Sequence, residues 1–174
     1  KNREHRYKTG ADMAGDLTLI YDFIRHVDGQ PTQQEKFSRV QKLEFFSEFP
    51  DTEMWEIINA GDWISIEQGE PIIREGEEDP SFYVLVDGEV AVRKSAQEIV
   101  KLGPGDCFGE MGIVAGRRRT ATIDAVTGVT VLKVRSSVIE RASINCQLRF
   151  QRKFLHTLIE RLEYTTERVV DNPL

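Results

Sequence analysis

Charged residues and glycines between residues 109 and 119 supply the groups of this sequence that are best suited to bind an anion. Glu110 lies between two glycines, and three arginines stand together at Arg117, Arg118 and Arg119. A guanidinium can bind an anion through two parallel hydrogen bonds. An ionised carboxylate only accepts hydrogen bonds, so it needs hydroxyl or N–H donors. Together these groups suit a ligand with one anionic group beside hydroxyls, such as a sugar phosphate.

The backbone of this stretch favours the same interpretation. β-rich segments flank it, so residues 109–116 connect two strands, and "EMGIV" can form one helical turn. The free N–H groups at the start of such a turn point toward whatever lies before it. Gly109 and Gly112 have no Cβ and permit close approach to the backbone. A surface loop with solvated arginines is the alternative that these residues alone leave open.

The elements that must position this stretch are short strands. From Trp63 to residue 135 the chain alternates β-rich segments with turns that contain Gly and Asp. This pattern predicts a small antiparallel, jelly-roll-like β-barrel, and "VDGEV" predicts a tight hairpin. With helical segments on both sides, the fold class is α+β. We divide the chain into an N-terminal helical extension (1–47), the barrel (48–135) and C-terminal lid or relay helices (136–174).

Three helices are predicted before the barrel from apolar residues at helical spacing. The first lies within residues 12–27, and the second follows a break at residues 28–31. The third begins with Thr52 as its N-cap and ends at Gly61.

A long amphipathic helix is predicted after the barrel, beginning with a capping box formed by Ser137 and Glu140. Apolar residues then recur every seven positions, at Leu148, Leu155, Leu162 and Val169. This stripe either packs back on the barrel and the N-terminal helices or forms the seam of a parallel homodimer.

Composition excludes several other classes of protein. The net charge of −6 argues against binding to nucleic acid or to anionic membranes. The longest apolar run, "FYVLV", is too short to span a bilayer. Two cysteines, Cys107 and Cys146, make no disulfide framework, so a reduced cytoplasmic setting is predicted. No metal-ligand spacing or local catalytic motif occurs. We therefore expect a protein that is not an enzyme and has no metal or cofactor. The sequence leaves open whether the chain is part of a longer protein.

The order of residues in "FGEMGIVAGRRRTATIDA" resembles the phosphate-binding cassette of cyclic nucleotide-binding domains. That cassette runs F-G-E, an apolar residue, a small residue, two apolar residues, a variable loop, and R-[A/S/T]-A. Residues 108–114 fill the first half, and Arg119, Thr120 and Ala121 fill the second. The patterns "GEPIIREG" and "SFYVLVDG" extend the similarity over roughly residues 43–160. The sensor domain of catabolite activator protein and the regulatory subunit of cAMP-dependent kinase belong to this family.

The resemblance implies a role for each cassette residue. Arg119 would pair with the cyclic phosphate, and Glu110 would accept a hydrogen bond from the ribose 2′-hydroxyl. Val100 and Val92 would pack on the base, and the last helix would act as lid and relay. Backbone amides would bind the sugar and phosphate near Gly109, Met111, Gly112 and Ala121.

Two departures from the family pattern bear on the ligand. Gly112 stands where many members carry Ala, and Arg117 and Arg118 replace a loop that often contains proline, so both arginines are expected to be exposed. Thr120 occupies a position where Ala accompanies cAMP and Thr is common where cGMP binds well. Its hydroxyl permits cGMP without excluding cAMP, and we favour cAMP.

The resulting prediction is a regulatory domain that binds cAMP, or alternatively cGMP, and relays binding to an effector domain or partner that the sequence does not identify. A fragment of a cAMP-responsive transcription regulator and a structural module that has lost its ligand are the alternatives. The residue that covers the base is left open among Phe154, Leu158 and Arg161.

Overall fold

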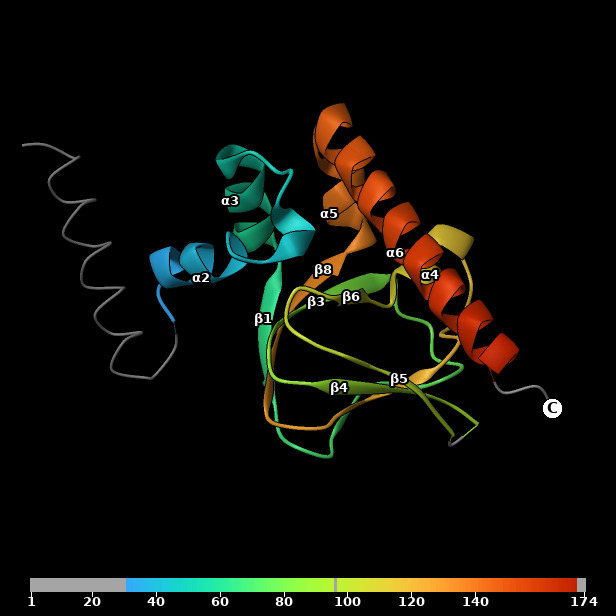
Figure 1. Ribbon diagram of the computed structural model, residues 1–174. Coiled ribbons are helices and arrows are strands. Elements are labelled where there is room, and N and C mark those ends of the chain that lie inside the picture. The colour runs from blue at the N-terminus through green and yellow to red at the C-terminus, as the bar shows by residue number, and fades with distance from the viewer. Residues whose placement is uncertain (1–30, 96, 172–174) are drawn as a thin grey trace, which may run out of the picture.

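Two four-stranded antiparallel sheets form the centre of the molecule. The computed structural model describes residues 31–95 and 97–171, with side chains as far as residue 167. The strand orders are β1-β8-β3-β6 and β2-β7-β4-β5. The predicted α+β class and jelly-roll-like antiparallel arrangement are confirmed. The strands form a sandwich of two sheets, however, and not a closed barrel (Figure 1).

The strands are short and follow one another closely along the chain. In order, they are β1 Asp62–Ile66, β2 Pro71–Ile73, β3 Ser81–Asp87, β4 Val90–Lys94, β5 Gln97–Leu102, β6 Cys107–Phe108, β7 Thr122–Ala125 and β8 Val129–Arg135.

One hydrophobic core fills the space between the two sheets. Leu85 and Val131 enter it from the first sheet, and Val90 and Ile123 enter it from the second. Successive residues of a strand point to opposite faces. The other face of β3 and β8 is apolar too and packs against the helices, so both strands are buried on both sides. This double burial explains why "FYVLV" is a continuous apolar run and does not alternate with polar residues.

The predicted hairpin at "VDGEV" is wrong. The strands before and after it, β3 and β4, lie in different sheets. The antiparallel neighbour of β4 that is next in the chain is β5. Gly88 has a φ of +89°, and a Cβ at this position would stand 2.5 Å from the carbonyl oxygen of Gly128. The turn therefore leads the chain from one sheet to the other against the neighbouring loop, and this packing requires glycine.

Helices precede and follow the strands, and one short helix lies between β6 and β7. Those before the strands are α2 Gln33–Val40, the 3₁₀ turn η2 Glu44–Phe46 and α3 Asp51–Ala60. The inserted helix is α4 Glu110–Ala115, and α5 Ser136–Arg141 and α6 Ile144–Asp171 follow the last strand. A capping box between Thr32 and Glu35 begins α2. The predicted end of α3 at Gly61 is confirmed. The first predicted helix, within residues 12–27, lies outside the described residues.

Two predicted N-caps are wrong. The N-cap of α3 is Pro50 instead of Thr52, because the extended backbone of this proline leads directly into Asp51. The N-cap of α5 is Arg135, and no side chain caps this helix. The Ser136 amide instead donates to the carbonyl oxygen of Pro80 as β8 passes into the helix.

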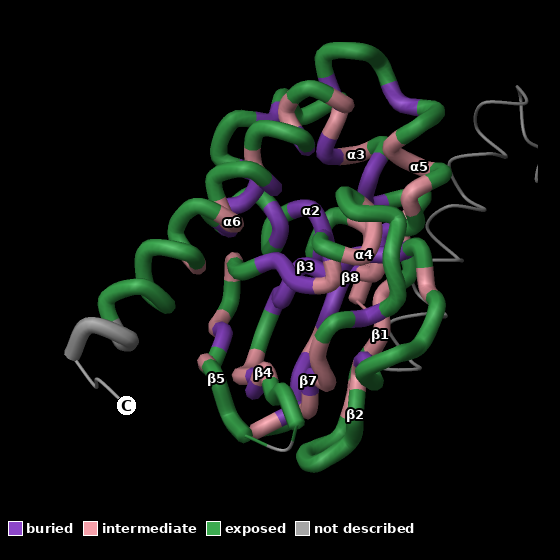
Figure 2. Tube along the Cα trace, turned by 90° about the vertical axis from the view of Figure 1, so that its right-hand side faces the viewer, coloured by how far each residue is buried: buried purple, intermediate pink, exposed green. Residues whose placement is uncertain are grey.

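The long helix α6 packs through a face other than the predicted stripe. Among its described side chains, Cys146, Phe150 and Phe154 are buried and recur at intervals of four. Phe150 and Phe154 contact the aromatic residues of η2 and β3. The stripe residues Leu148, Leu155 and Leu162 are 53–67% exposed. The alternative in which this stripe packs back on the barrel is therefore wrong for the described side chains, and the side chain of Val169 lies outside them. Much of α6 is exposed beyond its buried face (Figure 2).

Candidate functional site

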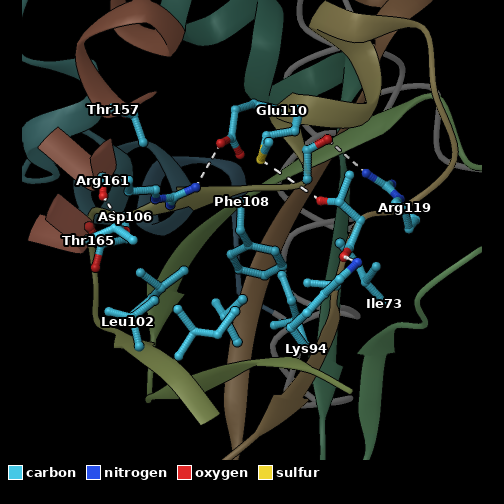
Figure 3. Close-up of a pocket in the computed structure, with 18 of the residues that line it drawn as sticks. Ile73, Lys94, Leu102, Asp106, Phe108, Glu110, Arg119, Thr157, Arg161 and Thr165 are labelled. Carbon is cyan, nitrogen blue, oxygen red and sulfur yellow. Dashed lines mark hydrogen bonds and ion pairs between the residues drawn. The ribbon is translucent and has the colours of Figure 1, made fainter. Parts of the chain in front are cut away.

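A cavity of about 550 Å³ opens between the second sheet, α4 and the distal half of α6. It is lined from the sheet by β4 and β5, from the cassette by residues 108–112 and 119–121, and from α6 by residues on its inner face (Figure 3). All nine site residues predicted from the sequence line it: Val92, Val100, Gly109, Glu110, Met111, Gly112, Arg119, Thr120 and Ala121. The cassette prediction and the cavity thus coincide in space, while the role of each residue stays a prediction.

Gly109 sets the entry of the chain into α4. It is the N-cap of this helix and has a φ of +82°. A Cβ at this position would stand 2.6 Å from Nη1 of Arg119. Glycine is therefore required both by the backbone conformation and by the close approach of the guanidinium. At Gly112 the same distance would be 3.4 Å, so alanine nearly fits there.

Glu110 is the first residue of α4, and its side chain is fully buried. Oε1 accepts a hydrogen bond from Nη1 of Arg161 at 2.7 Å, and Nη2 of Arg161 donates to the carbonyl oxygen of Cys107. Oε2 has no partner among the described residues. A buried carboxylate oxygen without a donor is costly, and this one belongs to a residue that lines the cavity. Figure 3 shows Glu110 and Arg161 pointing toward one another.

Arg119 is only 5% exposed, and its guanidinium is held by two carbonyl oxygens and a carboxylate. Nη1 donates to the carbonyl oxygen of Gly109 at 2.8 Å, and Nη2 donates to that of Ser81 at 2.7 Å. Nη2 also lies 3.1 Å from Oδ2 of Asp79. Nε has no partner among the described residues. The guanidinium is thus fixed in orientation while one of its donors is unused.

A polar cluster behind Arg119 centres on Asp79. Oδ2 accepts a hydrogen bond from the Tyr83 hydroxyl at 3.0 Å and lies 3.2 Å from Nζ of Lys133. Partial burial would raise the pKa of this carboxyl, but hydrogen bonds from Ser81, Lys133 and Tyr83 outweigh it and lower the pKa to about 2. Asp79 is therefore ionised at neutral pH and holds the charge that faces Arg119.

The wall formed by β4 and β5 is mainly apolar. Its apolar members are Val92, Ile99, Val100 and Leu102, with Ile73 and Ile123 beside them. Lys94 adds an ammonium that donates to the Thr120 carbonyl oxygen and to Oε1 of Glu75, both at 2.6 Å. Among the described residues, the Thr120 hydroxyl donates only to Sδ of Met111, at 3.9 Å. Sulfur is a weak acceptor, so this hydroxyl is available to a ligand.

Of the three lid candidates, only Arg161 lines the cavity. Phe154 is buried in the helical core, and Leu158 is not part of the lining. Sequence reasoning missed Tyr164, which lies three residues beyond Arg161 on the same face of α6 and lines the cavity. The spacing of three is the signal that could have found it, once Arg161 itself was known to face inward.

The described residues contain no group of three or more His, Cys, Asp or Glu side chains that could hold a metal ion. Cys107 and Cys146 are free and buried, and burial raises the pKa of the Cys107 thiol to about 12, with a further contribution from Glu110. A thiolate nucleophile is thus disfavoured at Cys107. Within the described ranges, the helices are too short or too polar to cross a membrane.

Comparison with known proteins identifies relatives of this arrangement. Residues 63–143 match the family model of the cyclic nucleotide-binding domain. A cGMP-dependent protein kinase of Plasmodium berghei (strain Anka) is 30% identical over 149 residues, which are 83% of this chain and 17% of the kinase. The chain therefore spans about a sixth of the length of this curated relative.

Solved structures show the same fold. A cyclic nucleotide-binding domain from Methylobacillus flagellatus KT has a TM-score of 0.71 and 21% identity, over 82% of this chain and 84% of that chain. The regulatory domain of Toxoplasma gondii PKA, crystallised with cAMP, has a TM-score of 0.62 and 21% identity, over 71% of this chain and 50% of that chain.

Proposed function

Because residues 63–143 belong to the cyclic nucleotide-binding domain family, we propose that this chain binds a cyclic nucleotide in the cavity and reports binding through α6. One observation carries the proposal. Glu110 and Arg119 are both buried, line one cavity, and each keep one polar atom without a partner among the described residues. Buried polar groups are normally satisfied, so these two atoms support a ligand that offers a hydroxyl to one and an anionic oxygen to the other.

The ligand groups are assigned to cassette residues. Arg119 pairs with the cyclic phosphate, and Oε2 of Glu110 accepts from the ribose 2′-hydroxyl. Val92 and Val100 pack on the base. The sugar and phosphate are bound by backbone amides near Gly109, Met111, Gly112 and Ala121. The Thr120 position permits cGMP without excluding cAMP, and our preference for cAMP stays a prediction.

The relay uses the carboxylate that the ligand and α6 share. Arg161 donates to Oε1 of Glu110, and under this proposal the ribose hydroxyl donates to Oε2. Ligand binding therefore changes the partner set of a group that α6 also contacts. A ligand shifts a helix only if it binds one helix position more tightly than another, and this shared carboxylate supplies such a difference.

The domain acts as a regulatory, non-catalytic module. It relays binding either to a separate partner or to an effector domain of a longer protein, such as a kinase or a transcription regulator. The exposed leucines at 148, 155 and 162 support a homodimer through α6, which sedimentation of the chain at several concentrations tests. The two free cysteines accord with a cytoplasmic setting.

Titration with a fluorescent cyclic nucleotide tests the proposed site. Truncating one partner of a desolvated, hydrogen-bonded charge pair costs roughly 2–5 kcal/mol. We therefore expect Arg119→Ala to weaken binding on the order of 30- to several-thousand-fold. The matched control is Arg117→Ala, two residues away on the exposed loop, which should change affinity little. Parental affinity in Arg119→Ala would show that the site is misassigned.

A further inference from the structure

Two of the three adjacent arginines have no part in the site described above. Arg117 and Arg118 are exposed, and Arg117 makes no ion pair with any described residue. Arg118 pairs with Glu78 at 2.6 Å, where both side chains are about 70% exposed. Such exposed pairs contribute little to stability. Arg118 also donates to the carbonyl oxygen of Gly76 at 3.1 Å, so its contacts are to the exposed loop before β3 and not to the cavity. The loop therefore presents two exposed cations that the proposed ligand does not explain, and the fold gives no ion pair among the described residues to Arg117.

These arginines lie directly before an exposed hydroxyl. Residues 117–120 form neither helix nor strand, and along them exposure changes from residue to residue: Arg117 and Arg118 are exposed, Arg119 is buried, and Thr120 is exposed. The Thr120 hydroxyl is thus accessible, with exposed cations two and three residues before it. Protein kinases that recognise basic substrates select by such charge patterns, since carboxylates in their clefts bind arginines that precede the acceptor hydroxyl.

We propose that Thr120 is a phosphorylation site for a basophilic protein kinase and that its phosphorylation closes this cavity to cyclic nucleotides, a consequence that rests on the proposed function. In the reaction, the Thr120 oxygen attacks the γ-phosphorus of a nucleoside triphosphate. The bond between the γ-phosphorus and the β,γ-bridging oxygen breaks, a nucleoside diphosphate leaves, and the hydroxyl proton passes to a base of the kinase.

Blockade follows from the place of Thr120 in the cavity wall. A phosphothreonine carries about −1.5 to −2 charges at neutral pH. It would stand in the sequence beside Arg119, the residue proposed to bind the cyclic phosphate, and its backbone carbonyl already accepts from the Lys94 ammonium. The attached phosphate therefore repels the ligand's anion and competes for the same cations.

Ligand and kinase should also exclude one another. Two main-chain hydrogen bonds hold Arg119 against the loop between β2 and β3. The Gly76 amide donates to the Arg119 carbonyl oxygen at 2.8 Å, and the Arg119 amide donates to the Glu77 carbonyl oxygen at 2.9 Å. A kinase must release them to draw Thr120 into its cleft. A bound nucleotide covers Thr120 and fixes Arg119, so it opposes that opening.

The test uses the whole chain and a constitutively active basophilic kinase whose own activity does not depend on cyclic nucleotides. Mass spectrometry should map phosphate to Thr120, and Thr120→Val should lose it. Arg117→Ala should slow incorporation at least about tenfold while nucleotide affinity stays unchanged. Arg135→Ala, an exposed arginine at the end of β8, is the control and should leave the rate unaltered. Saturating cAMP or cGMP should slow phosphorylation of the parent chain.

Binding to the phosphorylated chain completes the test. We expect its affinity for a fluorescent cyclic nucleotide to fall about 100-fold relative to mock-treated protein. No phosphate at Thr120 in the folded chain overturns the inference, and so does phosphate at Thr120 with unchanged affinity. If the untreated chain binds no cyclic nucleotide at all, the proposed function fails, and the mapping still decides whether Thr120 is a kinase site.

Discussion

The two halves of α6 contact the rest of the molecule by different chemistry. In the first half, Phe150 lies 4.9 Å from the ring centroid of Phe49, and Phe154 lies 5.0 Å from that of Phe82. In the second half, the inner face carries Thr157 and Arg161 over the cavity. Its principal polar contacts there are those of Arg161 with Glu110 and with the Cys107 carbonyl oxygen.

This difference separates an anchor from a lid. Interdigitated aromatic rings lose contacts and open a cavity when they part, so the first half is held in one position. A hydrogen-bonded ion pair can exchange one partner for another at lower cost, provided that each buried group stays satisfied. We therefore infer that ligand-dependent movement of α6 begins after Phe154 and leaves the preceding turns in place.

The largest effect should come from breaking the anchor. Phe150→Ala removes a fully buried ring from the aromatic cluster, and we expect the free energy of unfolding to fall by about 3–5 kcal/mol. Urea denaturation measures this. The matched control is Leu155→Ala on the exposed side of the same helix, which should change stability by no more than about 0.5 kcal/mol. Equal losses in both variants would mean that the exposed stripe is packed in solution.

Breaking the lid contact should cost less. Arg161→Met leaves the buried Glu110 carboxylate without its cation, and we expect a loss of about 1–3 kcal/mol in unfolding free energy. Adding Glu110→Gln should restore part of that loss, since the uncompensated charge is then removed. Arg152→Met is the control, because Arg152 is 74% exposed and pairs with Glu48 only at 3.7 Å. An Arg161→Met variant as silent as this control would contradict the proposed coupling.

The polar cluster behind Arg119 offers a pH test independent of the lid. The pKa of Asp79 is lowered from 3.8 to about 2. Its charged form is therefore favoured by folding, and the stability it contributes is complete above pH 3.8 and lost as the pH falls toward 2. Asp79→Asn should remove about 1 kcal/mol at neutral pH and flatten the stability profile between pH 4 and 2. The control is Asp87→Asn, at the exposed end of β3, which should leave the dependence of stability on pH as steep as in the parent chain.

Separation along the chain explains which site residues could be predicted from the sequence. The cassette was predicted because its groups lie in one connection, so that Glu110 and Arg119 are nine positions apart. Arg161 is 51 positions from Glu110, and Asp79 reaches Arg119 from the loop before β3. No local spacing connects these residues. They meet only after the strands have paired, as β1 does with β8 across the register Asp62↔Lys133.

The strands themselves were predictable, but their distribution between the sheets was not. Asp87-Gly88 has the composition of a hairpin turn, and the same composition also suits a turn between sheets. In α6 two apolar stripes compete, the leucines at intervals of seven and the buried set that includes Phe150 at intervals of four. Regular spacing favoured the leucines, whereas the aromatic side chains bury more surface and decide the packing.

The smallest expected effect concerns the base, which the distal half of α6 would cover. We expect the Thr120 hydroxyl to accept a hydrogen bond from the 2-amino group of a syn guanine, whereas adenine has no such donor. One neutral hydrogen bond contributes only ~0.5–1.5 kcal/mol net. Thr120→Ala should therefore weaken cGMP about two- to tenfold and leave cAMP nearly unchanged, with cAMP the tighter ligand of the parent chain. Calorimetric titration of both nucleotides against both chains measures this.

A parental preference for cGMP above about tenfold would exceed what this hydroxyl supplies and would overturn the cAMP assignment. The base would then be read by other polar groups of the lining, with Lys94 donating from the sheet and Glu160 accepting from the lid.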